Sequence, residues 1–353
     1  MIRVLIVDDS AIVRKVLNDE LSKYPDIEVV GSAMDPYVAR DKIIRLHPDV
    51  ITLDLEMPKM NGLAFLAKLM KYHPLPVVVV SSLTPRDSEA AMRALEFGAI
   101  EVICKPGPTS SMAGISRKLI QAIRAAASAQ ITKQQVDLDT SAAGRRMHDF
   151  HFQTTHQVIA IGASTGGPKA IESILRGLPA TSPGTLIVQH MPEQFTATFA
   201  QRLNQICQME VREAKDSDLL GPGIALVAPG DRHMLLQQNG DRYRVKVKNG
   251  PAVNHQRPSV DVLFQSVASS AKSNAVGVLL SGMGADGAKG LLAMHENGAY
   301  TLAQDEQTCV VFGMPKEGIR LGAVDMVVPI ERIPDAIISF LQTQERGTER
   351  KAL

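Results

Sequence analysis

The sequence predicts an α/β protein made of two parallel sheets in succession. Three observations lead to this fold class. Short apolar runs rich in Val and Ile alternate with amphipathic segments, a pattern typical of repeated β/α units. A length of 353 residues suits about two domains. A polar stretch without any apolar period, residues 128–155, separates the two regions that carry the β/α pattern.

The first region, residues 2–129, contains five strand-like runs. They read IRVLIV, IEVVGSA, DVITLDL, PVVVVSS and AIEVICK. Between the first two runs, the segment 10–22 places its apolar residues on one helical face: Ile12, Val13, Val16, Leu17 and Leu21. The repetition predicts a five-stranded parallel sheet with helices on both faces.

The stretch 128–155 reads as an interdomain linker because small and polar residues dominate it. We therefore expect a first domain over 1–127 and a second over 156–345. The charged end of the chain, 346–353, is expected to be a frayed tail.

The second region returns to the β/α pattern. Its strand-like runs read QVIAIG, GTLIVQH, GIALVAP, AVGVLLS and VDMVVP. Two further runs, RHMLLQQ and RYRVKVK, flank Asn239-Gly240-Asp241 and predict a β-hairpin. This region is therefore expected to be a second doubly wound α/β domain with an added hairpin.

Composition excludes several classes of protein. A net charge of +1 and the lack of a basic helix-turn-helix stretch argue against a nucleic-acid partner. No apolar run approaches the ~18 residues of a membrane span, so no membrane insertion is expected. The three cysteines are far apart and form neither a metal nor a disulfide pattern, which suits a cytoplasmic protein with free thiols.

Chemistry-bearing residues follow the strands of the first region. They are Asp8, Asp9, Asp54, Ser81 and Lys105. Because the carboxyl ends of parallel strands open on one crevice, these side chains are expected to converge there. Asp8, Asp9 and Asp54 together suit a hard Mg²⁺ ion, and Lys105 would offset the charge of a phosphoryl group. Asp54 is the natural nucleophile, giving an aspartyl phosphate.

This region closely resembles the response-regulator receiver domain. The resemblance rests on VDDS, LDLEMPKMNG, VVVVSS and KPG, which carry the five residues named above. It implies a flavodoxin-like fold and phosphotransfer from a histidine kinase to Asp54. It also implies that Ser81 hydrogen-bonds the phosphoryl group and that Lys105 acts in the same switch.

A candidate serine nucleophile lies in the second region. Gly162-Ala163-Ser164-Thr165-Gly166 matches G-x-S-x-G between a strand and a helix start. A phosphate-binding glycine loop looks similar. A dinucleotide fold, however, wants an acid at the end of the next strand, and here His190 stands there, which suits a general base.

Two further strand ends complete the candidate site. Asp286 follows the run AVGVLLSGMGA and could hold the His190 tautomer, although a helix cap is an equal reading. Backbone N–H groups of Thr165 or Met283 could form an oxyanion hole, and Met283 could equally serve packing. The chain order Ser164, His190, Asp286 favours a Rossmann-like fold with an independently arranged triad.

At this point the second region resembles the catalytic domain of chemotaxis protein-glutamate methylesterases. The motifs that carry the resemblance are GASTGGP, QHMP, APGDRHM, RPSVDVLF and LLSGMGADGAKG. It implies a phosphorylation-activated serine hydrolase that demethylates chemoreceptor helices, releases methanol, often deamidates receptor glutamines and needs no cofactor for its ester chemistry. His233 and Arg257 either line the substrate groove or serve the structure.

One alternative is a non-enzymatic response regulator. Its second domain would bind a nucleotide or a partner protein, using the glycine-rich turn after the first strand. His190, in the position of a ribose-binding acid, disfavours it.

Overall fold

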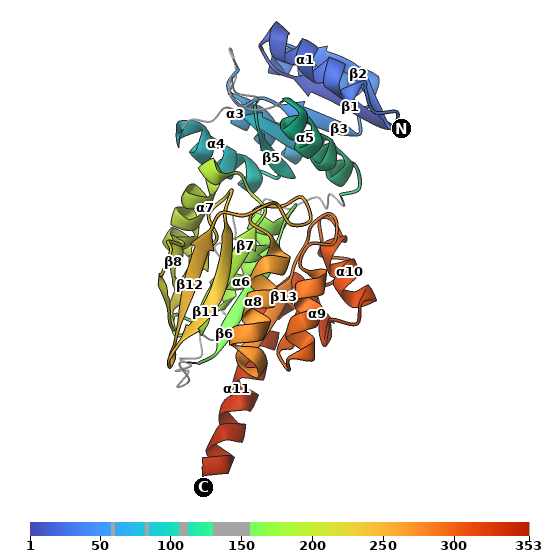
Figure 1. Cartoon of the computed structure of the whole chain (residues 1–353). Helices are drawn as coiled ribbons and strands as arrows, with labels where there is room; N and C mark the ends of the chain where they lie inside the picture. The colour runs from blue at the N-terminus through green and yellow to red at the C-terminus, as the bar shows by residue number, and fades with distance from the viewer. Residues whose placement is uncertain (58–60, 82–84, 106–111, 130–155, 353) are drawn as a thin grey trace. The chain divides into compact units, whose positions relative to one another are not determined.

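The computed structural model describes residues 1–57, 61–81, 85–105, 112–129 and 156–352. The chain divides into two compact units, residues 1–139 and 140–353. Figure 1 shows the elements of both, coloured along the chain. In the described residues no helix is both long enough and apolar enough to span a bilayer.

The first unit is a five-stranded parallel sheet in the order β2-β1-β3-β4-β5. Its strands are β1 (Ile2–Val7), β2 (Ile27–Ala33), β3 (Val50–Leu53), β4 (Val77–Ser81) and β5 (Glu101–Cys104). The helices between and after them are α1 (Ala11–Leu21), α2 (Pro36–Leu46), α3 (Gly62–Tyr72), α4 (Pro85–Glu96) and α5 (Met112–Ala127). This is the flavodoxin-like order, whose switch point lies between β1 and β3.

Local sequence explains where these helices begin. Ser10 caps α1 by accepting from Val13 N–H at 3.4 Å, and Asp35 caps α2 by accepting from Tyr37 and Val38 N–H. Both caps follow a strand at once, so the chain turns sharply at the carboxyl end of the sheet.

The second unit contains a seven-stranded parallel sheet in the order β15-β14-β13-β6-β7-β10-β8. Its strands are β6 (Val158–Ala163), β7 (Gly184–Gln189), β8 (Glu210–Glu213), β10 (Ile224–Val227), β13 (Ala275–Leu279), β14 (Tyr300–Gln304) and β15 (Met326–Val328). A smaller antiparallel sheet joins β11 (His233–Asn239), β12 (Arg242–Lys248) and β9 (Leu219–Leu220). The expected hairpin is present, with Gly240 and Asp241 as its two-residue loop.

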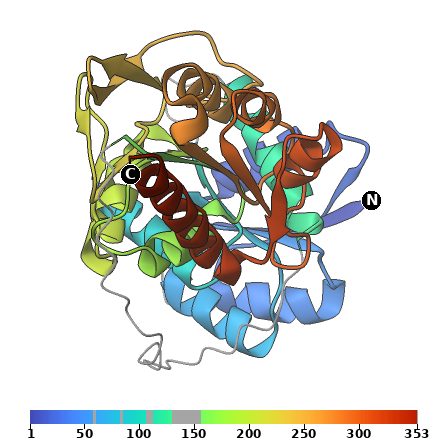
Figure 2. The same ribbon diagram turned by 90° about the horizontal axis from the view of Figure 1, so that it is seen from below.

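Helices cover both faces of the large sheet. One layer holds α6 (Gly167–Gly177), α7 (Glu193–Ile206) and α11 (Ile333–Ala352), and the other holds α8 (Val260–Ser270), α9 (Ala288–Glu296) and α10 (Met314–Arg320). Figure 2 shows α11, in dark red, on the side of the sheet away from α8 and α9. Short 3₁₀ turns lie at Lys272–Asn274 and Ile330–Arg332.

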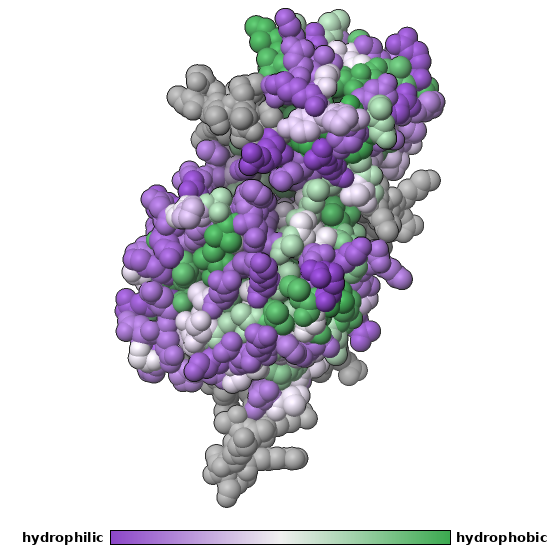
Figure 3. Space-filling view, turned by 45° about the vertical axis from the view of Figure 1, so that its right-hand side comes forward, coloured by the Kyte–Doolittle hydropathy of each residue, from purple (hydrophilic) through white to green (hydrophobic). Residues whose placement is uncertain are grey.

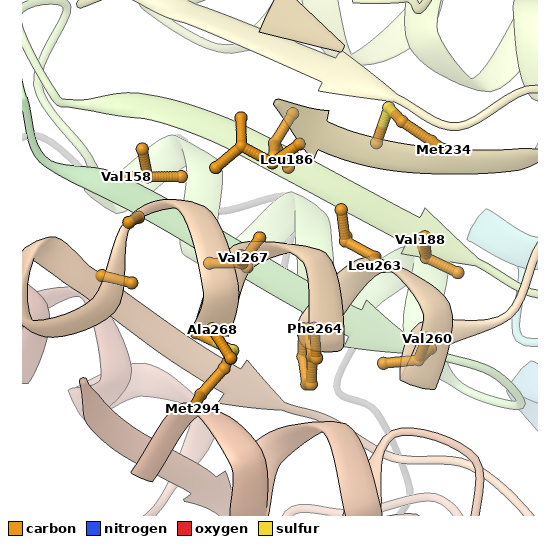
Figure 4. Packing of buried hydrophobic residues seen from close by; sticks show 14 of the residues in the cluster. Val158, Leu186, Val188, Met234, Val260, Leu263, Phe264, Val267, Ala268 and Met294 are labelled. Carbon is orange, nitrogen blue, oxygen red and sulfur yellow. The ribbon is translucent and has the colours of Figure 1, made fainter. Parts of the chain in front are cut away.

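The core of the second unit centres on α8. Figure 4 shows Val260, Leu263, Phe264 and Val267 on the side of α8 that meets the strands. These side chains repeat at helical spacing and are fully buried. Val158, Leu186 and Val188 meet them from the large sheet, Met234 from the hairpin and Met294 from α9. Each burial contributes about 1.5–3 kcal/mol, so α8 holds hairpin and sheet together.

Two parts of the second unit differ from expectation. The sheet contains β8 and β14 in addition to the five predicted strands. At the chain end, α11 continues to Ala352, so the segment 346–352, expected as a tail, carries on the last helix. Arg346, Glu349, Arg350, Lys351 and Ala352 are good helix formers, which offset Gly347 in this segment.

Candidate functional sites

The acidic pocket forms at the switch point of the first unit. Ligand oxygens of Asp8, Asp9 and Asp54 lie within 4.8 Å of one another. Asp8 and Asp54 are 1% and 2% exposed, whereas Asp9 is exposed. Lys105 Nζ lies 3.0 Å from Asp8 Oδ2 and 2.7 Å from Asp54 Oδ2. The structure thus brings together all of the predicted carboxylates and the lysine.

Electrostatics in this pocket favour a ligand of positive charge. Burial raises the pKa of Asp54, against the opposing ion pair with Lys105. Burial also disfavours charge on Lys105, but hydrogen bonds and charge from Asp54 and Asp8 outweigh it and raise the pKa of the lysine. One ammonium group, that of Lys105, is therefore shared between two buried carboxyl groups. Three carboxylates in reach of one point are a donor set that fits Mg²⁺.

Ser81 lies at the end of β4 and is fully buried. Its Oγ has no hydrogen-bond partner among the residues that the structure describes. Its carbonyl accepts from Lys105 N–H at 2.7 Å, which ties the serine to the lysine strand. A buried, unpartnered hydroxyl beside the acidic pocket is suited to bind an incoming oxygen atom.

The serine turn of the second unit ends β6. Gly166 has φ +79°, and an added Cβ there would lie 2.6 Å from Val310 Cβ, so only glycine fits the turn. Ser164, 8% exposed, lies between the end of β6 and Gly166, the N-cap of α6. The strand-to-helix context predicted for this motif is present.

His190 is placed beside Ser164 by strand register. Ala163 of β6 pairs with Gln189 of β7, and His190 N–H donates to Ala163 carbonyl at 3.1 Å. The next residue of each strand is therefore Ser164 and His190. The imidazole is 6% exposed, and its Nε2 lies 2.8 Å from Asp286 Oδ2.

The free nitrogen of this imidazole is informative. His190 Nδ1 is buried and has no hydrogen-bond partner among the described residues. Because the Asp286 carboxylate can only accept, Nε2 carries the proton and Nδ1 keeps a lone pair. Nδ1 is therefore the ring nitrogen that is free to accept a proton.

Asp286 is held by several donors. Its Oδ1 accepts from Ser259 Oγ at 2.8 Å and Asn254 Nδ2 at 2.8 Å, and its Oδ2 accepts from Val260 N–H at 2.7 Å. Burial opposes the charged form, but the bond from His190 and these further bonds prevail and lower the pKa of Asp286. Sequence reasoning missed Asn254, Ser259 and Val260. Ser259 could have been found as the N-cap of α8 in RPSVDVLF.

The oxyanion candidates flank Ser164. Ser164 N–H donates to Ser281 carbonyl at 3.0 Å, which brings the loop after β13 against the serine. A Cβ added to Gly282 would lie 2.7 Å from Ser164 Cβ, so this glycine permits the approach. Met283 follows at 40% exposure, and its N–H has no acceptor among the described residues. Thr165 stands at the α6 start and is buried.

His233 and Arg257, left open by the sequence, have structural contacts. His233 is 3% exposed, donates from Nε2 to Pro251 carbonyl at 2.9 Å and accepts at Nδ1 from Ser259 N–H. Arg257 pairs with Asp231 and donates to Gly250 carbonyl at 2.7 Å. Both therefore anchor the loop that precedes α8.

Comparison with known proteins identifies two families in this chain. Residues 159–337 match the family described as CheB methylesterase, and residues 4–116 match the response regulator receiver domain. A relative from Syntrophus aciditrophicus, named protein-glutamate methylesterase/protein-glutamine glutaminase 2, is 54% identical over 96% of this chain and 99% of its own. One of the same name without the number, from Yersinia pestis, is 51% identical over 97% of each chain.

A solved structure resembles the second unit. The CheB methylesterase catalytic domain of Thermotoga maritima superposes with a TM-score of 0.52 at 37% identity. It covers 53% of this chain and all of its own. The comparisons give no support to a nucleotide-binding output domain.

Proposed function

This chain belongs to the CheB methylesterase family, and from that premise we propose that Ser164, His190 and Asp286 act together as its catalytic triad. The activity is hydrolysis at the γ-carbonyl of protein glutamate methyl esters, with the receiver domain giving control by phosphorylation in chemotaxis. The observation that carries the triad is the buried, unpartnered Nδ1 of His190, which directly follows β7 as Ser164 directly follows the neighbouring β6.

The first half-reaction forms an acyl-enzyme. Ser164 Oγ attacks the ester carbonyl carbon while His190 Nδ1 takes the hydroxyl proton. Asp286 stabilises the imidazolium through Nε2–H. The negative charge passes to the carbonyl oxygen, where we place the Met283 N–H as donor, joined by Thr165 N–H at the positive end of α6. Collapse of this intermediate expels methanol, protonated by His190.

The second half-reaction returns the free enzyme. Water attacks the acyl carbon, His190 Nδ1 takes its proton, and Ser164 leaves as the alcohol once that proton is returned. The product is a glutamate carboxylate. The same cycle on a glutamine side chain expels ammonia in place of methanol, so one triad serves the glutaminase reaction as well.

The receiver supplies the switch. We propose that Asp54 accepts a phosphoryl group from a histidine kinase, and that Asp8, Asp9 and Asp54 hold the Mg²⁺ required for it. When bound, the ion neutralises charge on the transferred group and its acceptor. Lys105 and the Ser81 hydroxyl are positioned to bind phosphoryl oxygens. We assign 1–127 to the receiver, 128–155 to a linker and 156–345 to the esterase.

The substrates proposed here are the cytoplasmic helices of chemoreceptors, so we place the enzyme in the cytoplasm. The esterase chemistry needs only the three side chains and the backbone donors, so we propose no cofactor for it. A kinase in the same compartment would provide the phosphoryl group.

A methanol-release assay on methylated receptor, with and without phosphodonor, tests this function. Ser164→Ala is expected to lower the rate to near background without loss of fold, because the nucleophile is gone. Ser269→Ala is the matched control: its Oγ donates to the Gln265 carbonyl within α8, and its rate is expected to equal that of wild type. Most activity remaining in Ser164→Ala would overturn the triad.

A further inference from the structure

Two buried carboxylates lie next to each other behind the esterase triad. Asp286 and Asp261, in the first turn of α8, are each 3% exposed. Burial raises the pKa of Asp261; a hydrogen bond from Gly290 N–H opposes this, and the charge of Asp286 adds to it. Such a pair is unfavourable unless donors stand between the two groups.

One amide stands between them. Asn254 Nδ2 lies 2.7 Å from Asp261 Oδ2 and 2.8 Å from Asp286 Oδ1. An amide nitrogen carries two hydrogens, so each carboxylate receives one. The second oxygen of Asp261 accepts from Gly290 N–H at 2.7 Å, which anchors Asp261 to α9.

A tight turn aims this amide inward from the surface. Val253 and Gln256 exchange two backbone hydrogen bonds of 3.0 and 2.8 Å around Asn254 and His255. Both central residues have positive φ, 51° and 64°, which is the mark of a type I′ turn. Asn suits the first of these positions, whereas Gly is preferred at the second. The turn is exposed, yet its Asn side chain reaches two buried acids.

We propose that Asn254 is a positioning residue of the esterase, whose amide locks Asp286 against the anchored Asp261 so that Oδ2 faces His190. This rests on the triad proposed above. Without the amide, Asp261 Oδ2 would lose its donor, and the Asp261 N–H, 3.3 Å from Asp286 Oδ1, would be the donor left between the two acids. Asp286 would then be free to turn about its remaining donors, Ser259 Oγ and Val260 N–H, and the imidazole bonded to its Oδ2 would turn with it.

Among the described residues, charged and titratable groups come from several elements around Asp286. His190 comes from the end of β7 and Asp261 from α8. The loop before α8 adds His255 and the Arg257–Asp231 pair, and β11 adds His233, which bonds to Ser259 N–H. A substitution of Asn254 leaves all of these in place, so a shifted pH profile would report the carboxylate pair.

Three variants separate positioning from a structural role. Asn254→Gly keeps the positive-φ turn and removes the amide. Asn254→Asp keeps the shape, removes both donors and adds a third negative charge. His255→Gly is the matched control, because it changes the other central residue of the same turn and leaves the amide intact.

The assay is methanol release by the full chain across pH 5–9, with melting curves for each variant. Asn254→Gly should lower kcat by about 10–100-fold with little change in KM, since misplaced catalytic groups cost rates of this size. Asn254→Asp should also move the acidic limb of the pH profile up by about one unit, because added negative charge stabilises the protonated imidazole. His255→Gly should behave as wild type.

Three outcomes would overturn the proposal. One is an Asn254→Gly rate within twofold of wild type, and another is an Asn254→Asp profile with an unmoved acidic limb. The third is an equal loss in His255→Gly, which would mean that the turn matters and the amide does not. If Asn254→Gly melts early, the isosteric Asn254→Asp decides alone. If Asn254→Gly releases methanol at the wild-type rate while Ser164→Ala is inactive, this inference is rejected and the proposed function still holds.

Discussion

Replacing Asp286 by Asn should disable the esterase by changing which nitrogen of His190 carries the proton. At present Asp286 Oδ2 accepts from Nε2, and Nδ1 is free to act as base. An amide at this position can donate to Nε2 instead, which would place the proton on Nδ1 and block the base. An equivalent change in a triad of intact geometry lowers kcat by about 10⁴. We expect a fall of about 10³–10⁴-fold, or about 4–5.5 kcal/mol in the barrier.

The same change should cost stability. Both carboxylate oxygens accept hydrogen bonds: Oδ1 from Ser259 and Asn254, and Oδ2 from Val260 N–H and His190. Whichever way the amide is turned, its NH₂ group meets a buried donor. One such mismatch costs about 1–3 kcal/mol. For a unit of about 200 residues this is a fall of roughly 3–10 °C in Tm.

Methanol release under saturating substrate measures kcat, and a thermal melt measures stability. Asp325→Asn is a suitable control, because Asp325 accepts two hydrogen bonds from Thr301 and has no part in the triad. It should keep its rate. An Asp286→Asn enzyme with more than a tenth of the wild-type kcat would refute the tautomer argument.

Three further predictions concern the switch, the isolated esterase and acid stability. Asp54→Asn should incorporate no phosphate from a small-molecule phosphodonor and keep its basal esterase rate; labelling at the wild-type rate would place the acceptor elsewhere. A fragment beginning near residue 147 should be faster than the unphosphorylated full chain and ignore phosphodonor, since a docking bias of about 1–3 kcal/mol changes activity roughly 5–150-fold; a slower fragment would favour an assisting receiver. Because the pKa of Asp286 lies below its ordinary 3.8, its stabilising contribution is present above that value and lost as pH falls through the lower folded pKa. The free energy of unfolding of the fragment, measured with urea, should therefore fall below about pH 4, and this fall should be smaller in Asp286→Asn.

Much of the fold was accessible from sequence because the central strands are continuous apolar runs. The strands β1, β4, β6 and β13 are buried along nearly their whole length, so they can be recognised in the sequence as continuous apolar runs. In contrast, β8 reads EVRE, with only one buried side chain, and no alternation reveals it. It is a strand because β10 pairs with it, which is a tertiary cause.

The candidate site shows the same division. Ser164, His190 and Asp286 could be proposed because each follows a predicted strand, and parallel strands bring their carboxyl ends together. The contact of Asn254 with Asp286 could not be predicted from the sequence, because it depends on how a loop folds over the start of α8. From the sequence, His233 was equally suited to lining a groove and to a structural role. Only the structure shows that both of its ring nitrogens are engaged in hydrogen bonds, which favours the structural role.

Figure 3 shows mainly hydrophilic residues on the face it displays, with hydrophobic ones in small separate patches.

Because β6 pairs with strands that are far apart in the sequence, the two domains can be completed only at different stages of synthesis. Val158 of β6 aligns with Gly184 of β7 on one side and with Ala275 of β13 on the other. The nucleophile thus leaves the ribosome long before the strand and the aspartate that complete its site. All five strands of the receiver sheet, in contrast, lie within the first 105 residues. Since domains fold as units during translation, a nascent chain can acquire its phosphoryl acceptor early and its esterase only near completion. An unfinished chain therefore lacks β13 and the aspartate on which the proposed triad depends.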